Sequence, residues 1–124
     1  MPYSYDVDPD VCIAYVRGWG PLDVEESLEA PAVLAKHPDY SSDFGVVVDL
    51  RDVLYEPRAK DVVAFARNLI SLRQHFGWRV GIVMPPKLAL AGELSAAIAQ
   101  TGGFPLQIFT DLDAAFRWVR PSPH

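Results

Sequence analysis

Residues 45–53 of the chain read GVVVDLRDV, a stretch that begins with an uninterrupted β-branched run. Its three consecutive valines predict a strand over residues 45–50. A helix is predicted next, over residues 58–76, because apolar side chains recur there at helical spacing. Pro57 suits the first turn of this helix and Gly77 suits its end. A strand followed directly by an amphipathic helix is the repeating unit of a parallel α/β sheet.

The same alternation continues on both sides of this unit. The predicted strands cover residues 3–7, 11–17, 45–50, 78–84 and 106–109. The predicted helices cover residues 23–36, 58–76, 88–101 and 110–119. The first two strands are separated only by the turn residues Asp8-Pro9-Asp10, so they form a hairpin. The order β-β-α-β-α-β-α-β-α therefore predicts an α/β fold with a mainly parallel five-stranded sheet, an N-terminal β-hairpin and four helices.

Three local features carry expectations of their own. Pro31 lies inside the first predicted helix, so we expect a kink or two short helices there. Thr110 begins a sequence that resembles a capping box for the last helix, with Asp113 in place of the usual glutamate. Cys12 lies between apolar residues of the second predicted strand, which favours a buried and inert thiol.

One face of the predicted sheet leaves two possibilities. The later strands alternate apolar and other residues, whereas strands covered on both faces read as continuous apolar runs. Helices then crowd one face, and Val47, Val83 and Phe109 form an apolar strip on the other. Either this strip is partly open, or a helix or the first hairpin covers it.

Length and composition limit the classes of function. The 124 residues suit one domain, predicted over residues 1–120 with a frayed tail at 121–124. Half of the residues are hydrophobic and the net charge is −5, which allows a real core and disfavours binding to nucleic acid or anionic membrane. The apolar segment 88–99 is too short to span a bilayer, and the N-terminus is not a signal peptide. The single cysteine fits a reducing compartment, so we expect a cytoplasmic protein.

The chain resembles the STAS domains of anti-sigma-factor antagonists, and more narrowly the small bacterial STAS-like proteins grouped with lipid-transfer CRAL-TRIO domains. The resemblance covers nearly the whole chain. It rests on the opening hairpin, HPDYSSDF at residues 37–44, VVVDLRDV at 46–53 and FTDLDAAFRWV at 109–119. It implies a fold built for binding a protein partner in bacterial regulation.

The phosphorylation switch of that family does not carry over to this chain. The family's regulatory serine lies at the start of the helix after the central strand. The matching stretch here, LYEPRAK at residues 54–60, contains no serine or threonine, and the next serine is Ser71, deep in the helix. The resemblance still implies a binding surface near this helix start.

The candidate site is the edge where the carboxyl ends of the parallel strands meet, because ligands of α/β sheets bind there. This edge combines a large aromatic ring, cations, a carboxylate and the starts of helices, which suit recognition of a partner or a small anion. The candidate binding residues are Trp19, Arg51, Asp52, Tyr55, Arg58, Lys87 and Thr110.

Each candidate also has a purely structural interpretation. Trp19 can anchor a partner or close the end of the core. Asp49 and Asp52 can share acid–base chemistry, but a structural ion pair with Arg51 is favoured. Arg58 and Lys87 can hold a phosphate, yet without a glycine-rich loop a solvated surface charge is favoured.

No metal site, cofactor or catalytic cluster is predicted. The three histidines are scattered, without the spacing of zinc ligands or of a triad. The small residues Ala89, Gly92, Ala96 and Ala99 share one face of the third predicted helix, which indicates tight docking on the sheet or, alternatively, a helix–helix dimer contact.

Three hypotheses for function follow. The first is a non-enzymatic, STAS-type interaction module that binds a protein partner, either as a monomer or as a homodimer. The second is a domain that binds a small molecule or lipid, which a core without a pocket of about 300 Å³ would disfavour. The third, and the least favoured, is an enzyme that uses Asp49 or Asp52.

Overall fold

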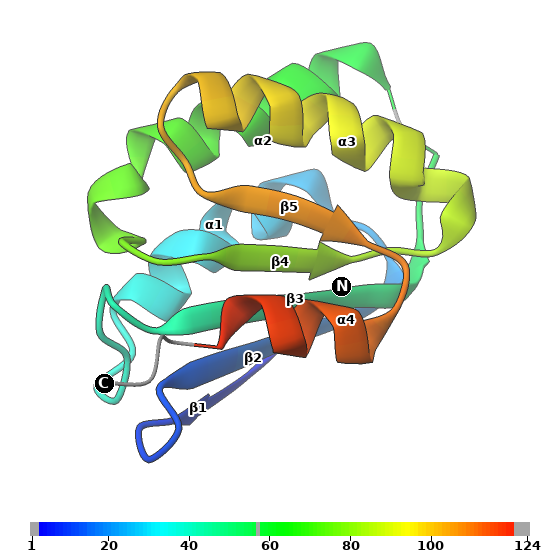
Figure 1. The fold of residues 1–124 in the computed structure, drawn as a ribbon. Helices are drawn as coiled ribbons and strands as arrows, with labels where there is room; N and C mark the ends of the chain where they lie inside the picture. Colours follow the sequence, from blue (N-terminus) through cyan, green and yellow to red (C-terminus); the bar gives the residue numbers. More distant parts are fainter. Residues whose placement is uncertain (1–2, 57, 121–124) are drawn as a thin grey trace.

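The computed structural model describes residues 3–56 and 58–120 and confirms the predicted α/β fold (Figure 1). Five strands form one sheet in the order β1-β2-β3-β4-β5, with β1 antiparallel to β2 and the other neighbours parallel. The elements are β1 (Tyr3–Asp8), β2 (Ile13–Pro21), α1 (Val24–Ala35), β3 (Gly45–Leu54), α2 (Ala59–Ser71), the 3₁₀ helix η1 (Arg73–His75), β4 (Val80–Val83), α3 (Pro86–Thr101), β5 (Leu106–Phe109) and α4 (Leu112–Val119).

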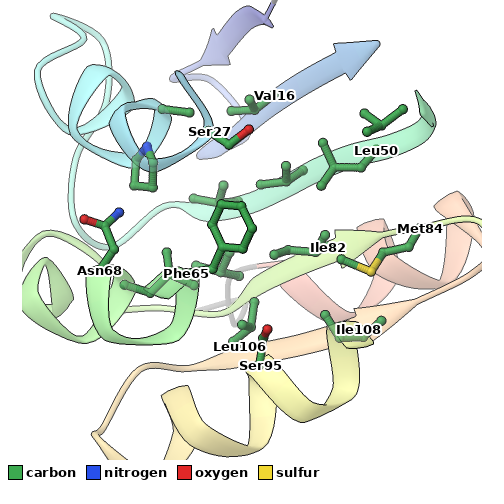
Figure 2. A pocket seen from close by; sticks show the side chains of 18 of the residues that line it. Val16, Ser27, Leu50, Phe65, Asn68, Ile82, Met84, Ser95, Leu106 and Ile108 are labelled. Carbon is green, nitrogen blue, oxygen red and sulfur yellow. The ribbon is translucent and has the colours of Figure 1, made fainter. Parts of the chain in front are cut away.

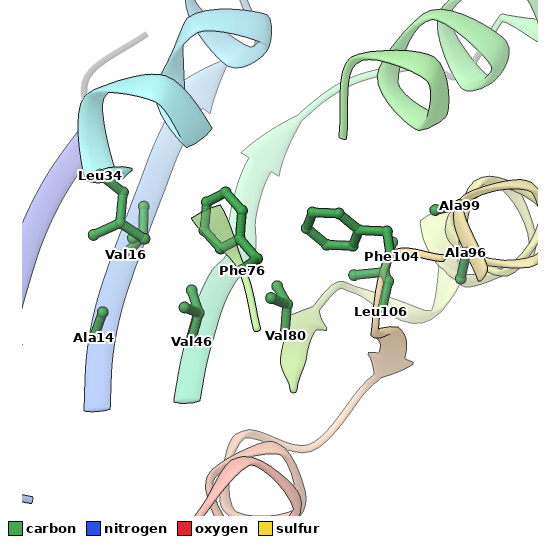
Figure 3. Packing of buried hydrophobic residues seen from close by; sticks show 10 residues of the cluster. All are labelled: Ala14, Val16, Leu34, Val46, Phe76, Val80, Ala96, Ala99, Phe104 and Leu106. Carbon is green, nitrogen blue, oxygen red and sulfur yellow. The ribbon is translucent and has the colours of Figure 1, made fainter. Parts of the chain in front are cut away.

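The larger core lies between the sheet and the helices α1, α2 and α3 (Figure 3). Phe76 and Phe104 are its largest rings, with centroids 5.4 Å apart, and both are almost completely buried. Each follows the end of a helix, so the two rings join the helical layer to the sheet. Around them lie small and β-branched side chains: Ala14, Val16, Val46, Val80, Ala96 and Ala99.

A smaller core on the opposite face shows whether the predicted apolar strip of Val47, Val83 and Phe109 is open. Helix α4 covers it, since Val47 and Val83 are fully buried against Ala115 and Val119. The Phe109 ring packs against Trp118, with centroids 5.6 Å apart. Helix α4 packs mainly on β3, β4 and β5, and it reaches β2 through the Phe116 ring, which stacks on Tyr15.

Two strands end four residues later than predicted. Strand β2 continues through Gly18 and Trp19 to Pro21, and β3 continues to Leu54, because the two strands pair in parallel along almost their whole length. A register shift between Arg17 and Trp19 interrupts the pairing without ending it. The glycines around Trp19 therefore do not end the strand.

The expectation for Cys12 was wrong. This residue lies in the hairpin turn before β2, with a φ of 58°, and its side chain is only half-buried. The turn requires a left-handed residue, and Cys12 occupies that position although the conformation is unfavourable for an L side chain.

The helix boundaries also correct the prediction in detail. Helix α1 is one continuous helix through Pro31, so the alternative of two short helices was wrong. Helix α2 ends at Ser71, and its predicted last turn is the separate 3₁₀ helix. The N-cap of α4 is Asp111, whose carboxylate accepts from the Asp113 amide at 3.3 Å, so Thr110 does not cap this helix. The predicted tail at 121–124 and Pro57 lie outside the described residues.

Candidate functional site

The seven candidate residues do not form one site. Trp19, Arg51 and Asp52 belong to a polar group on the sheet face that also carries α4. Tyr55 and Arg58 line a hollow beside the start of α2, on the other side of the sheet. Lys87 lies in the first turn of α3 and Thr110 in the loop before α4, and both are exposed.

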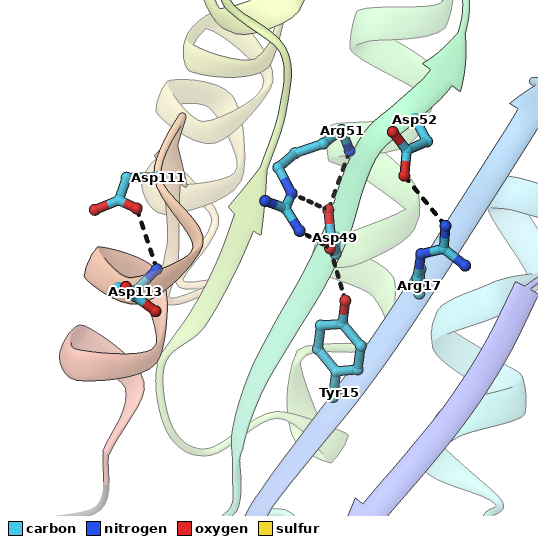
Figure 4. A network of polar contacts seen from close by, with 7 residues as sticks. All are labelled: Tyr15, Arg17, Asp49, Arg51, Asp52, Asp111 and Asp113. Carbon is cyan, nitrogen blue, oxygen red and sulfur yellow. Dashed lines mark hydrogen bonds and ion pairs between the residues drawn. The ribbon is translucent and has the colours of Figure 1, made fainter.

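The polar group centres on Asp49, which is 1% exposed (Figure 4). Its carboxylate accepts from the Tyr15 hydroxyl at 2.6 Å, and Arg51 donates to both carboxylate oxygens from Nε and Nη2, each at 2.9 Å. Burial alone would raise the Asp49 pKa, but the hydrogen bonds from Arg51 and Tyr15 outweigh it and hold this pKa below its usual value. The group is therefore a charged, fully engaged carboxylate.

Tyr15 completes this arrangement. Burial, followed by its hydrogen bond to the Asp49 carboxylate, raises the Tyr15 pKa to about 12, so the hydroxyl keeps its proton. Its ring stacks on Phe116 of α4 with centroids 5.7 Å apart. These contacts support the structural interpretation of Asp49. The residue lies within strand β3 and not in a loop after it.

Arg17 lies beside this network and connects Trp19 to Asp52. Its Nη2 atom donates to Asp52 Oδ2 at 3.1 Å, and its guanidinium carbon lies 4.9 Å from the centroid of the Trp19 ring. The Arg17 side chain is 41% exposed and the Asp52 side chain is 64% exposed. Trp19 is half-buried, and one face of its ring makes a cation–π contact with Arg17.

A second feature is an apolar cavity of about 170 Å³ between the sheet and helices α1, α2 and α3 (Figure 2). Sheet residues such as Val48, Ile82 and Ile108 point under the helices but remain half-exposed, because this space is not filled. The helical wall is close to the sheet at Gly92, where a Cβ atom would collide with Met84 Sδ. The cavity is an unfilled part of the main core, continuous with it.

The few polar groups in the cavity wall are already hydrogen-bonded. Ser27 Oγ lies 2.8 Å from the Tyr3 hydroxyl, and Asn68 Nδ2 donates to a backbone carbonyl at 2.7 Å. Ser95 Oγ donates to the Val62 carbonyl at 3.3 Å. With these groups engaged, the wall offers an occupant mainly apolar contact, which favours an apolar molecule or an apolar part of one.

The cavity adjoins a wider outer hollow of about 500 Å³, since Leu22 and Tyr55 line both. Tyr55 donates to Asp61 Oδ2 at 2.6 Å, and burial, followed by this hydrogen bond, raises the Tyr55 pKa to about 12. Tyr55 therefore stands as a neutral side chain at the junction. The outer hollow is polar and carries both charge signs: Glu25, Glu56, Arg58, Lys60 and Asp61.

Sequence reasoning missed this cavity and most of its lining residues. Val48, Ile82 and Ile108 have the pattern of ordinary core residues, and an unfilled volume leaves no mark in a sequence. The one available signal was the run of small residues in α3. This run correctly predicted docking on the sheet, because Gly92, Ala96 and Ala99 are buried there. Their burial argues against a dimer contact through that face of α3.

Within residues 3–56 and 58–120, no three histidine, cysteine or acidic side chains are grouped so as to hold a metal ion. His37 has a local role, because its Nδ1 atom accepts from the Asp39 amide at 3.1 Å. No helix in this part of the chain is long and apolar enough to cross a membrane.

Comparison with known proteins identifies the class of fold. No family model matches the chain, and no curated protein matches it. It is similar to the crystal structure of an uncharacterized protein of the DUF3478 family with a SpoIIAA-like fold from Shewanella loihica PV-4. The two share 18% identity over 95% of this chain and 92% of that chain, with a TM-score of 0.53. The chain therefore has a SpoIIAA-like, STAS-type fold, as its sequence resemblance predicted.

Proposed function

We propose that this chain is a non-catalytic binding module of the STAS type, and that it binds a small apolar or amphipathic molecule in the cavity under α1, α2 and α3. The observation that carries the proposal is the cavity itself, about 170 Å³ of unfilled space with an apolar wall. A dry apolar cavity of about 150 Å³ is enough to bind a molecule the size of benzene.

The size of the cavity limits the ligand. Drug-sized ligands occupy pockets of about 300–1,000 Å³, so the cavity alone encloses only a ring or a short chain. A longer ligand has room for a polar end in the outer hollow, past Leu22 and Tyr55. The proposed ligand therefore has an apolar part of about six to eight heavy atoms.

The engagement of the Asp49 and Asp61 carboxylates supports a binding role over a catalytic one. Asp49 is fixed by Tyr15 and Arg51, and Asp61 accepts from Tyr55. A general base needs a pKa near the working pH, whereas the Asp49 pKa is lowered. We place the module in the bacterial cytoplasm, where the free thiol of Cys12 stays reduced.

The test is a titration with toluene, benzoate and benzylamine, followed by methyl NMR of the isotope-labelled protein. Toluene should shift the methyl signals of Ile82, Ile108 and Met84, with a dissociation constant in the millimolar range or tighter. The two charged probes then show which charge the outer hollow accepts. Unchanged cavity methyl signals with all three probes would contradict the proposal.

Binding of a protein partner is a second candidate, favoured by the arrangement around Arg17. Tyr15, Arg17, Trp19, Arg51 and Asp52 form a platform beside α4, and we call it the Arg17 platform. Tryptophan, tyrosine and arginine dominate the energetics of protein interfaces, and here hydrogen bonds and stacking already hold them in place.

The test for this second candidate is crosslinking in the native host followed by mapping of the linked residues. A partner bound at the Arg17 platform should be lost in Trp19→Ala and kept in Leu54→Ala, a control at an exposed strand end. Equal capture by both variants would remove the platform from consideration without touching the ligand proposal.

A further inference from the structure

Four exposed apolar side chains form a ridge on the outer surface of α2 and α3. Leu90, Leu94 and Ile98 follow each other at intervals of four along α3, with exposed fractions of 71%, 54% and 37%. Val63 of α2, 37% exposed, lies on the adjoining helix. We call this set the α2–α3 ridge. Spacing by four places three of its members in one row on the helix surface.

The side chains of the ridge cannot pack into the chain's own core. The opposite face of α3, with Gly92, Ala96 and Ala99, is already buried on the sheet. Helices α2 and α3 form the outermost layer on this side of the molecule, with no described element beyond them (Figure 1). A contiguous apolar row of this kind on an outer surface is typical of an interaction site.

The charges beside the ridge indicate what covers it. Helices α2 and α3 run in the same direction (Figure 1), and the Ser95 hydroxyl donates to the Val62 carbonyl, which sets the two residues at the same level. Two residues before this contact on each helix lie Lys60 of α2 and Glu93 of α3. Lys60 and Glu93, both exposed, therefore stand at one level, a cation on one helix and an anion on the other.

We propose that the α2–α3 ridge binds a second copy of this chain, related by a two-fold axis parallel to the helices. Such an axis lays α3 of each copy over α2 of the other and brings both ridges together along the axis. It keeps every residue at its own level, so Glu93 of each copy faces Lys60 of the other, twice per dimer. A two-fold axis across the helices would not pair these charges in this way.

The size of this surface predicts a dimer of moderate affinity. Helix α3 has 16 residues and is about 24 Å long, and two adjacent helices are about 20 Å wide. The face is thus roughly 500 Å² per copy, or roughly 1,000 Å² in total, at the low end for a specific interface. We expect dissociation in the micromolar range.

The experiment is sedimentation equilibrium of the full chain over a micromolar concentration series. The wild type should change from monomer to dimer across the series. Leu94→Asp should abolish the dimer, because it buries two carboxylates near the axis. Val33→Asp on α1 is the matched control, with a similarly exposed valine outside the ridge, and should leave the dimer unchanged. Circular dichroism checks that each variant is folded.

A charge swap tests the two-fold arrangement itself. Glu93→Lys and Lys60→Glu should each weaken dimerisation about fivefold or more, and the double variant should restore it. A wild type that stays monomeric, or a dimer that survives Leu94→Asp, overturns the inference. A double variant as weak as the single ones overturns the proposed axis. None of these residues lines the cavity, and only Lys60 belongs to the outer hollow, so failure of Leu94→Asp or Glu93→Lys leaves the ligand proposal standing.

Discussion

Replacing Ala91 by leucine would place a larger side chain in the cavity from its α3 wall. Ala91 is half-buried and lines the cavity. The substitution adds three carbon atoms, roughly 80 Å³, about half of the available 170 Å³. At about 24 cal/mol per Å³ of cavity removed, perfect filling would stabilise the protein by about 2 kcal/mol. Strain from an imperfect fit reduces this gain, so we expect about 1 kcal/mol.

The same substitution should remove ligand binding. The space that remains is well below the roughly 150 Å³ that a benzene-sized molecule needs. Toluene at about three times its dissociation constant should stabilise the wild type by about 0.8 kcal/mol, and should stabilise Ala91→Leu by almost nothing. The variant without ligand is thus more stable than the wild type, and toluene narrows this difference.

Urea unfolding with and without toluene measures both effects. Ala114→Leu is the matched control, because it adds the same atoms on α4, across the sheet from the cavity. It should leave the toluene effect intact. An Ala91→Leu protein that is less stable than the wild type would refute the claim that the space is empty and accessible to this side chain. One that keeps its full response to toluene would refute the placement of the ligand in this cavity.

Three further predictions concern single polar groups. Tyr55→Phe should cost about 1–2 kcal/mol in urea unfolding, because it deprives the buried Asp61 carboxylate of a 2.6 Å hydrogen bond; an unchanged midpoint would mean that this bond contributes nothing. Asp49→Asn should destabilise the protein by roughly 2 kcal/mol at neutral pH. Because the Asp49 pKa is lowered in the folded state, its contribution is complete above the unfolded value of about 4 and is lost as the pH falls below it. The variant should therefore show a shallower loss of stability in acid, and identical acid profiles would exclude this carboxylate as a contributor. Cys12→Gly should stabilise the protein by about 1 kcal/mol, because it relieves a φ of 58°; a lower melting temperature in calorimetry would contradict this reasoning.

The fold was largely readable from local patterns. The valine run of β3, the helical spacing of residues 58–76 and the order of elements gave the mainly parallel sheet, because each of these signals acts within a single element. Strand β5 was predicted with its observed limits. Errors arose where a neighbour decided the outcome. Strand β2 outlasts Gly18 because β3 pairs with it, and Cys12 lies in a turn that only the hairpin register defines.

The candidate site shows the same division. The residue types and their position after the strands indicated the strand-end edge, where Trp19, Arg51 and Asp52 do come together. Successive residues of a strand point to opposite faces of the sheet, and this alternation continues only as far as the strand does. The extension of β2 and β3 therefore separates these residues from Tyr55 and Arg58.

The amino-acid order alone was sufficient for the alternation of strands and helices, for the covering of one sheet face by small residues of α3, and for the lack of a serine in residues 54–60. The cavity, the saturated Asp49 carboxylate and the level of Lys60 beside Glu93 arise only after packing. These three features have the same physical origin, because each is a relation between distant segments. They depend on the volume left unfilled, on hydrogen bonds between strands and on the register between helices. A sequence specifies each segment, and the distances between segments follow from how their side chains fit.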